Sequence, residues 1–254
     1  MVTIDNLTVS YRQHPALHHI SGEFATGSLT AVIGPNGSGK STLLKSIMGL
    51  LRPEGGQIIR NTPRRSIAFL AQLTEIDRSF PMSVRDCVLL GCWSAVGPWG
   101  KVPHALLQRV ASAITQVGLA GFEQRTVGSL SSGQLQRVLF ARLMVQEADL
   151  ILLDEPFNAI DSRTTDALLA LVHQWHSEGR TVVAVLHDDD MVRHHFPQTV
   201  LLARELVAWG DTAQVLTPAH LQRARLLAIA WDDSADICHT DEAATATQPA
   251  RRAT

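Results

Sequence analysis

Cysteine is scarce in this chain of 254 residues, and its three copies form no recognisable pattern. Their number is odd, and Cys87, Cys92 and Cys238 show neither the pairing of a disulfide framework nor the Cys-x-x-Cys spacing of a zinc site. We therefore expect reduced thiols, with Cys87 as a small core residue. An excess of charge is also missing: the formal net charge is -2, which gives no general electrostatic attraction to nucleic acid.

Long hydrophobic runs are absent as well. A membrane-spanning helix needs roughly 18 consecutive apolar residues, whereas runs such as Val182–Leu186 have the length of a strand. The first residues, Met1–Asp5, lack the basic and apolar regions of a secretory signal. We therefore expect a cytosolic protein that can dock on a membrane protein.

The segment 34–42, which reads Gly-Pro-Asn-Gly-Ser-Gly-Lys-Ser-Thr, fits the phosphate-binding pattern G-x-x-x-x-G-K-[ST]. It follows an apolar strand-like stretch, Leu29–Ile33, and precedes a helical one, which is the context that the pattern requires. Glycines let backbone N–H groups turn toward an anion, and the helix N-terminus adds a positive end. Lys40 can reach the β- and γ-phosphates, and the Ser41 hydroxyl can bind Mg²⁺. The expected nucleotide-binding residues here are Gly34, Asn36, Gly37, Ser38, Gly39, Lys40, Ser41 and Thr42.

Two acids follow a second buried strand. The run Leu150–Leu153 is wholly apolar, as in a parallel strand covered on both faces, and Asp154 and Glu155 follow it. Ligands of parallel α/β sheets bind at this carboxyl end. Asp154 is placed to orient Mg²⁺, and Glu155 is placed to polarise an attacking water.

The order of elements predicts an α/β fold: a P-loop NTPase core with a mostly parallel sheet, an N-terminal antiparallel β part and an inserted helical subdomain at about 73–148. Residues 1–238 are expected to form one domain, and 239–254 a disordered tail, because apolar periodicity stops there. Strands are expected at 2–11, 29–33, 57–60, 66–71, 150–153, 181–186, 199–203 and 205–209. Helices are expected at 43–48, 84–91, 105–117, 135–146, 163–178 and 219–231.

A third motif, Leu-Ser-Ser-Gly-Gln at 130–134, precedes a helix, and Gln72 and His187 each follow a strand. With the P-loop and the Asp154-Glu155 pair, this ordered set resembles the ATPase subunit of ABC transporters over about residues 1–220. The motif is similar to the family signature LSGGQ, with Ser132 in place of the first glycine.

The resemblance implies ATP and Mg²⁺ as cofactors and assigns roles by position. Lys40, Glu155 and His187 would be catalytic, with Glu155 as the base or water-orienting group and His187 at the γ-phosphate. Gln72 would contact Mg²⁺ together with Ser41 and Asp154. The remaining contacts to nucleotide would come from Tyr11, the only tyrosine, stacked on adenine, and from Ser131, Gly133, Gln134 and Asp161.

The resemblance further implies partners. Two copies would pair head to tail, with each ATP between one P-loop and the Ser131–Gln134 segment of the other copy. Separate integral membrane permease subunits would bind the pair at the cytoplasmic face of the bacterial inner membrane, and a periplasmic or surface metal-binding protein would act indirectly.

The segment 77–91 is similar to ATPases of zinc, manganese and iron-chelate importers, with Phe80-Pro81 followed by Val-x-Asp-x-Val-x-x-Gly. This favours import of a transition metal ion, zinc first and then manganese. Import of a siderophore, haem or cobalamin is the alternative. A soluble ABC protein acting on nucleic acid is less favoured, because the chain has one ATPase unit, no heptad run and a net charge of -2. A P-loop kinase or GTPase is less favoured, because the motif at 130–134 is followed by Asp154-Glu155.

Several aromatic and histidine residues stay open to interpretation. The neighbours His18-His19 and His194-His195, and the group Cys238-His239 with Asp241 and Glu242, are interpreted as solvated surface residues rather than metal ligands, because adjacent side chains diverge. Trp93 and Trp99 would either form an exposed patch for a partner or pack inside the helical part.

Overall fold

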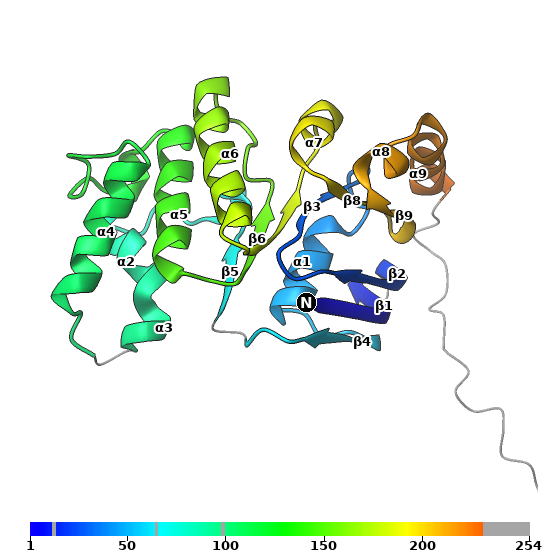
Figure 1. Ribbon diagram of the computed structural model, residues 1–254, viewed down its shortest axis with the longest axis horizontal. Coiled ribbons are helices and arrows are strands. Elements are labelled where there is room, and N and C mark those ends of the chain that lie inside the picture. Colours follow the sequence, from blue (N-terminus) through cyan, green and yellow to red (C-terminus); the bar gives the residue numbers. More distant parts are fainter. Residues whose placement is uncertain (12–13, 64–65, 98–99, 231–254) are drawn as a thin grey trace, which may run out of the picture.

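The computed structural model describes residues 1–11, 14–63, 66–97 and 100–230 (Figure 1). Two sheets organise the chain. The larger has six strands in the order β5-β6-β7-β3-β8-β9, and the smaller has three in the order β2-β1-β4. The strands of the larger sheet are β5 (Ile67–Leu70), β6 (Leu150–Asp154), β7 (Thr181–Val185), β3 (Leu29–Ile33), β8 (Gln198–Ala203) and β9 (Glu205–Asp211).

The pairing inside the large sheet explains its apolar sequence. Strands β5, β6, β7, β3 and β8 pair in parallel, and β9 returns antiparallel to β8. All five residues of β3, β6 and β7 are buried, because helices or the second sheet cover both faces. Alternate residues of β6 belong to two hydrophobic cores on opposite faces of the sheet. Ile151 and Leu153 lie in one core, and Leu150 and Leu152 lie in the other.

The small sheet is antiparallel and is built from β1 (Val2–Tyr11), β2 (His14–Phe24) and β4 (Gly55–Arg60). Its apolar side chains form one core with α1 (Lys40–Met48) and with one face of the large sheet. Figure 1 shows α1 between the two sheets. This arrangement holds the start of α1 directly after the carboxyl end of β3.

Helices cover the opposite face of the large sheet. They include α5 (Ser132–Gln146), α6 (Ser162–Ser177), α8 (Thr212–Val215) and α9 (Pro218–Ala230), and α7 (Asp189–His195) follows β7. Helices α2 (Val84–Leu89), α3 (Trp93–Val96) and α4 (His104–Gln116) lie beyond α5, to one side of the sheet (Figure 1). None of the helices in the described part of the chain combines the length and apolar character of a membrane span.

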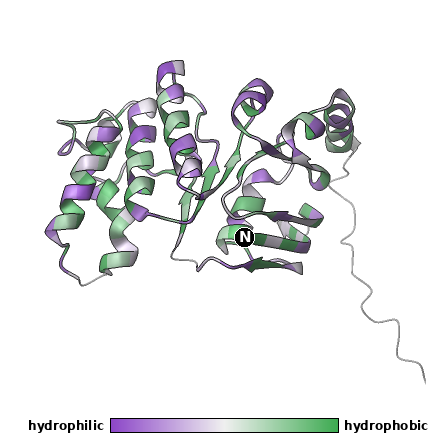
Figure 2. Cartoon of the chain, in the orientation of Figure 1, coloured by the Kyte–Doolittle hydropathy of each residue, from purple (hydrophilic) through white to green (hydrophobic). Residues whose placement is uncertain are grey.

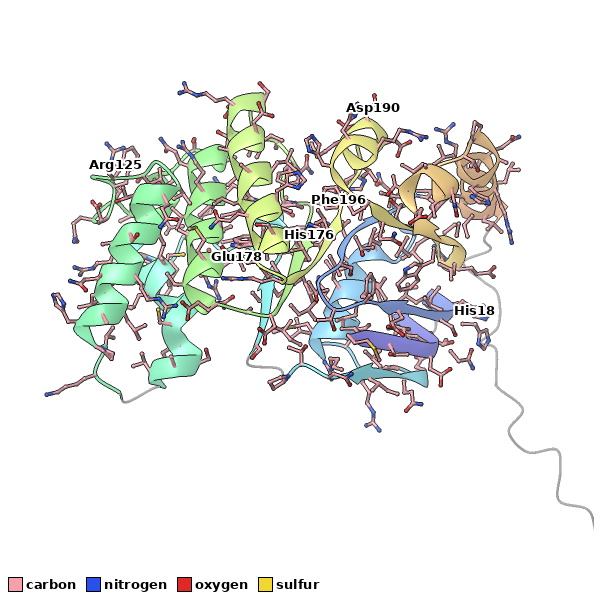
Figure 3. The ribbon with its side chains drawn as sticks, viewed as in Figure 1. His18, Arg125, His176, Glu178, Asp190 and Phe196 are labelled. Carbon is pink, nitrogen blue, oxygen red and sulfur yellow. The ribbon has the colours of Figure 1, made fainter. Side chains whose placement is uncertain are left out.

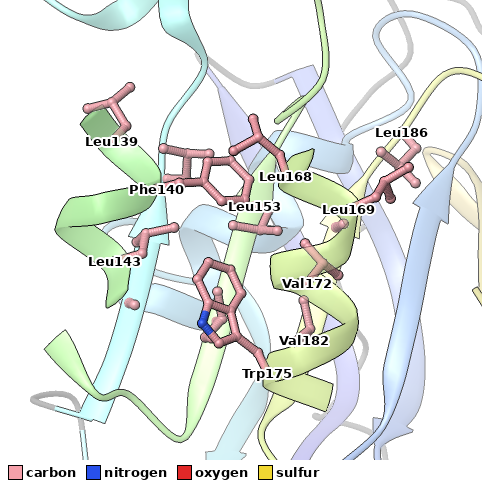
Figure 4. Close-up of a cluster of buried hydrophobic side chains, with 14 of the residues drawn as sticks. Leu139, Phe140, Leu143, Leu153, Leu168, Leu169, Val172, Trp175, Val182 and Leu186 are labelled. Atoms are coloured by element: carbon pink, nitrogen blue, oxygen red, sulfur yellow. The ribbon is translucent and has the colours of Figure 1, made fainter. Parts of the chain in front are cut away.

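A cluster of large side chains joins α5 and α6 to the sheet (Figure 4). Phe140 of α5 and Trp175 of α6 stack with ring centroids 5.6 Å apart and planes 12° apart. Leu153 of β6 and Val172 of α6 are fully buried in the same core. Figure 2 shows the same division over the whole chain, with hydrophobic strands inside and hydrophilic residues on the outer helix faces. This packing fixes helices α5 and α6 against the sheet.

The predicted fold class is confirmed, with differences at element boundaries. The helix expected at 43–48 begins at Lys40 and the one expected at 135–146 begins at Ser132, because each starts inside its motif. The hairpin of β8 and β9 is confirmed. Strand β2 and helix α7 were not predicted from the sequence. Register shifts interrupt the pairing of β1 with β2, and such shifts blur the alternation that marks a strand.

Candidate active site

The glycine-rich loop between β3 and α1 requires glycine for steric and conformational reasons. Gly34 has a φ of 150°, and a Cβ atom there would lie 2.0 Å from the carbonyl oxygen of Leu202. Gly39, which precedes α1, has a φ of 91°, and its Cβ would lie 2.2 Å from the oxygen of Ala16. No side chain caps α1 at Gly39, so the N–H groups of its first turn are directed to a ligand or to solvent.

Lys40 is folded back over this loop. Its Nζ donates to the carbonyl oxygens of Gly34 and Pro35, each at 2.9 Å. The side chain is buried, and burial lowers the pKa of Lys40, while the carboxylates of Glu155 and Asp154 act in the opposite direction. An anion in the loop would compensate this buried charge, so the site is electrostatically prepared for phosphate.

The other expected loop residues differ in exposure. Asn36 and Gly37 are exposed, whereas Ser38 and Thr42 are buried. The Ser38 hydroxyl oxygen is buried with no hydrogen-bond partner, and the backbone oxygen of Ser38 accepts from Arg204 N–H at 3.0 Å.

A polar cluster forms where β3, β5 and β6 end. The Ser41 hydroxyl donates to Oδ1 of Asp154 at 3.0 Å, and Gln72 Nε2 donates to the Ser41 oxygen at 3.3 Å. Asp154 is 1% exposed, and its Oδ2 is buried without a partner. Burial raises the pKa of Asp154; the hydrogen bond from Ser41 opposes this rise and the charge of Glu155 adds to it. An unpaired buried carboxylate oxygen beside a hydroxyl and an amide is a set that suits Mg²⁺, which prefers oxygen ligands.

Glu155 joins this cluster to β7. Its Oε1 lies 2.6 Å from His187 Nε2 and accepts from Gln72 Nε2 at 2.9 Å. The backbone at Glu155 has a φ of 51°, a left-handed conformation, and its N–H donates to Val185 O at 3.2 Å. The sharp turn after β6 aims the carboxylate across the sheet edge, toward the residue that follows β7.

The Ser-Ser-Gly-Gln segment caps its own helix. Ser131 is the N-cap of α5: its hydroxyl accepts from Gln134 N–H at 3.2 Å, and the Gln134 Oε1 accepts from Ser131 N–H at 3.0 Å. Ser132, which departs from the family pattern, accepts a hydrogen bond from Arg78 at 3.5 Å. A Cβ at Gly133 would meet Asp161 Oδ2 at 3.6 Å, Thr164 Oγ1 at 3.8 Å and Ile160 Cγ2 at 3.9 Å, which are ordinary contacts, so this glycine is not sterically required within one chain.

Asp161 caps α6. Its carboxylate accepts from the Thr164 N–H at 2.9 Å and from the Thr164 hydroxyl at 2.8 Å, and these bonds hold the pKa of Asp161 below its ordinary value.

The predicted residues therefore fall into two groups in one chain. Ser41, Gln72, Asp154, Glu155 and His187 meet directly, whereas the described hydrogen bonds of Ser131 and Gln134 stay within their own segment. Tyr11 ends β1, and its side chain lies outside the described part.

Two residues of the site were missed in the sequence reading. Asn158 Nδ2 donates to Oε2 of Glu155 at 3.1 Å, and Arg204 Nε reaches Gly37 O at 3.4 Å. Asn158 lies three residues after Glu155, within reach in a turn, so its amide was the available signal. Arg204 comes from the β8–β9 turn, far from the P-loop in sequence, and nothing local indicated it.

The residues left open in the sequence reading are placed as follows. Trp93 is 56% exposed, and Trp99 lies outside the described residues, as does the group Cys238, His239, Asp241 and Glu242. Cys87 and Cys92 are buried free thiols, as expected for Cys87. His18 lies on the small sheet, away from Asp190 on α7 (Figure 3). Among the described residues, no group of three or more His, Cys, Asp or Glu side chains is arranged to hold a metal ion.

Comparisons with known proteins agree with this geometry. The family model described as "ABC transporter" matches residues 17–158. The chain is 40% identical over 228 residues to the manganese transport system ATP-binding protein MntB of Listeria innocua, covering 88% of this chain and 95% of the relative. It is 39% identical over 232 residues to the zinc transport system ATP-binding protein TroB of Treponema pallidum, covering 88% and 86%.

Solved structures give the same result. A putative metal-chelate type ABC transporter in an inward-facing conformation matches with a TM-score of 0.79 and 31% identity, over 89% of this chain and 88% of that one. A dimeric ATP-binding cassette in a post-hydrolysis state with ADP and phosphate matches with a TM-score of 0.74 and 25% identity, over 84% and 99%. The chain therefore belongs to the ABC transporter family and carries its ATPase domain.

Proposed function

We propose that this chain is the ATP-hydrolysing subunit that powers uptake of a transition metal ion, zinc or manganese, through separate membrane subunits. Relatives whose names state a manganese or zinc transport system are 36–40% identical over most of the chain, which supports this cargo class. Uptake of a metal chelate is the second candidate, because the solved transporter of that type is 31% identical. The net charge of -2 supports no nucleic-acid partner.

The glycine-rich loop and Lys40 would hold the phosphates of ATP. Lys40 would exchange its bonds to the Gly34 and Pro35 carbonyls for phosphate oxygens, which relieves a buried unpaired charge. Ser41, Gln72 and Asp154 would hold Mg²⁺, and the buried Oδ2 of Asp154 supports this assignment. When bound, Mg²⁺ neutralises the charge of the phosphate oxygens. Gly34, Asn36, Gly37, Ser38, Gly39 and Thr42 complete the proposed nucleotide contacts.

Glu155 is the proposed base. It would orient a water and accept its proton while the water oxygen bonds to the γ-phosphorus. The bond from that phosphorus to the bridging oxygen breaks, which yields ADP and inorganic phosphate. The short contact with His187 fixes the Glu155 carboxylate and places the imidazole at the same edge. The observation that carries the proposal is this carboxylate, directed at the end of β7 and next to the buried Asp154.

The second half of the site would come from a second copy. Ser131, Gly133, Gln134 and Asp161 do not reach the P-loop through any described hydrogen bond of their own chain, so we infer that they contact ATP held by the partner. The match to a dimeric cassette supports this arrangement. Tyr11 would stack on adenine, a contact typically worth about 1–3 kcal/mol.

Residues 1–238 would form the ATPase domain, with 73–148 as an inserted helical subdomain and 239–254 as a tail. The subunit would lie at the cytoplasmic face of the bacterial inner membrane, bound to permease subunits. An external metal-binding protein would deliver the cargo to the permease.

The test of the chemistry is Glu155→Gln, which keeps the shape of the side chain and removes its basicity. We expect ATP turnover of the purified chain to fall by about 10²–10⁴-fold while ATP affinity, measured by calorimetry, changes little. Turnover close to that of the unmodified chain would refute the role of Glu155. The control is Gln174→Glu on the exposed face of α6, which should leave both values unchanged.

The cargo is tested by growth. A strain that lacks this chain should grow poorly when zinc or manganese is limiting, and the ion that restores growth identifies the cargo. Restoration by a siderophore or haem instead would favour the chelate candidate.

A further inference from the structure

The carboxylate of Glu155 is held on both oxygens. Gln72 and His187 contact Oε1, whereas Asn158 Nδ2 donates to Oε2 at 3.1 Å. The Asn158 backbone N–H also donates to the Glu155 carbonyl at 3.3 Å, which closes the turn after β6. Glu155 has a left-handed backbone conformation, with a φ of 51°, in the turn that brings Asn158 within hydrogen-bond distance of the carboxylate.

Contacts to one oxygen alone would leave this carboxylate free to rotate. The terminal torsion of a glutamate is broad, because it joins an sp³ to an sp² carbon. A donor on Oε2 from the opposite side fixes the plane of the group.

The position of Asn158 in the structure is suited to this role. It borders a cavity of about 420 Å³ with Gln72 and Ser132, and a second of about 190 Å³ with His187 and Met191. Asn158 and Glu155 therefore line both cavities together.

We propose that Asn158 is a positioning residue for the hydrolysis of ATP: its amide holds Oε2 of Glu155 so that the carboxylate keeps one orientation toward the attacking water. This inference rests on the proposed role of Glu155.

The decisive variant is Asn158→Asp, which keeps the size of the side chain and replaces the donor with a second carboxylate. The new carboxylate cannot donate to Oε2 and repels the Glu155 carboxylate, which therefore loses its fixed orientation. At pH 7 we expect kcat to fall about 10-fold or more, and KM for ATP to stay within about twofold. Asn158→Ala, which only removes the donor, should lower kcat about 5-fold.

Gln174→Glu is the matched control. Gln174 also donates an amide N–H to a glutamate, Glu178, at 2.9 Å, but on the exposed surface of α6. This variant should reproduce the wild-type kcat and KM. Thermal unfolding of all variants checks that the fold is retained.

The two proposals fail in different ways. If Glu155→Gln abolishes turnover while Asn158→Asp and Asn158→Ala keep the wild-type kcat, the positioning role of Asn158 alone is overturned. If Glu155→Gln itself retains turnover, the proposed catalytic role of Glu155 is overturned and this inference with it. In the Glu155→Gln background, Asn158→Ala should cause no further loss, and an additional 5-fold loss would place Asn158 outside this pathway.

Discussion

At the scale of single residues, Asp154 shows the conflict between stability and function in this site. A carboxylate that is 1% exposed has lost its hydration, and only Oδ1 is compensated, by the Ser41 hydroxyl. Burial raises its pKa, so the folded chain binds this proton more tightly than the unfolded chain does. The free energy of unfolding therefore falls as the pH rises from the ordinary aspartate pKa of about 3.9 through the raised value.

Asp154→Asn should consequently stabilise the nucleotide-free chain at pH 7 by about 2–4 °C in Tm, the shift that 1 kcal/mol produces at this size. The gain should shrink as the pH falls below the raised pKa of Asp154, because the folded chain then protonates this carboxylate. Mg²⁺ with a non-hydrolysable ATP analogue should raise the Tm of the wild type more than that of the variant. Differential scanning calorimetry measures all three values.

The control for this change is Asp149→Asn, at the exposed start of the same strand, whose effect should stay within about 0.5 kcal/mol. A lower Tm for the nucleotide-free Asp154→Asn variant at pH 7 would contradict the account of Asp154 as a destabilising buried charge.

At the scale of elements, α5 combines two tasks at its first turn. Ser131 and Gln134 form a capping box, which satisfies N–H groups that the helix itself leaves unpaired. The same residues are proposed to contact the partner's ATP. The hydroxyl therefore has a structural and a functional use, and a simple deletion cannot separate them.

Two substitutions at Ser131 separate the tasks. Ser131→Ala should cost about 1 kcal/mol of stability through the lost cap, and turnover should fall as well. Ser131→Asp restores a good N-cap, so Tm should return to the wild-type value, yet turnover should stay low because its carboxylate repels the partner's phosphate. Thermal unfolding and steady-state ATPase assays measure the two effects, and wild-type turnover in Ser131→Asp would exclude the contact.

At the scale of the whole molecule, the site residues divide between two faces. The P-loop cluster lies at the strand ends of the large sheet, and the Ser131–Gln134 segment lies at the start of α5 in the helical part. A head-to-tail pair related by a two-fold axis would bring each face of one copy to the other face of its partner.

Glu155→Gln should therefore bind Mg²⁺ and ATP without turning it over and should accumulate as a dimer of twice the 27.7 kDa chain mass. Gel filtration with light scattering tests this with and without ATP. Adding Ser131→Asp should return the variant to a monomer, because the charge lies at the proposed seam. A monomer in Glu155→Gln at saturating Mg-ATP would refute the sandwich.

Most of the fold could be predicted from short sequence patterns. The P-loop, the two acids after an apolar run and the helix starts are short-range features, since each needs only a few neighbouring residues of the right kind. The buried strands β3, β6 and β7 were predictable because burial on both faces leaves a continuous apolar run. The strand β2 was not, because register shifts disturb its alternation.

Short sequence patterns could not predict which side chains that are distant in the sequence come into contact. The hydrogen bonds of Glu155 to Gln72 and His187 join segments 83 and 32 residues apart, and their distances follow from the order of strands in the sheet. Likewise, Oδ2 of Asp154 lacks a partner because it is buried, and the hydrogen bond from Asn158 to Glu155 depends on the turn after β6. The residue types alone indicate which reaction the site can catalyse. The tertiary structure decides how far each side chain is desolvated and how it is oriented, because desolvation and orientation depend on atoms that are distant in the sequence.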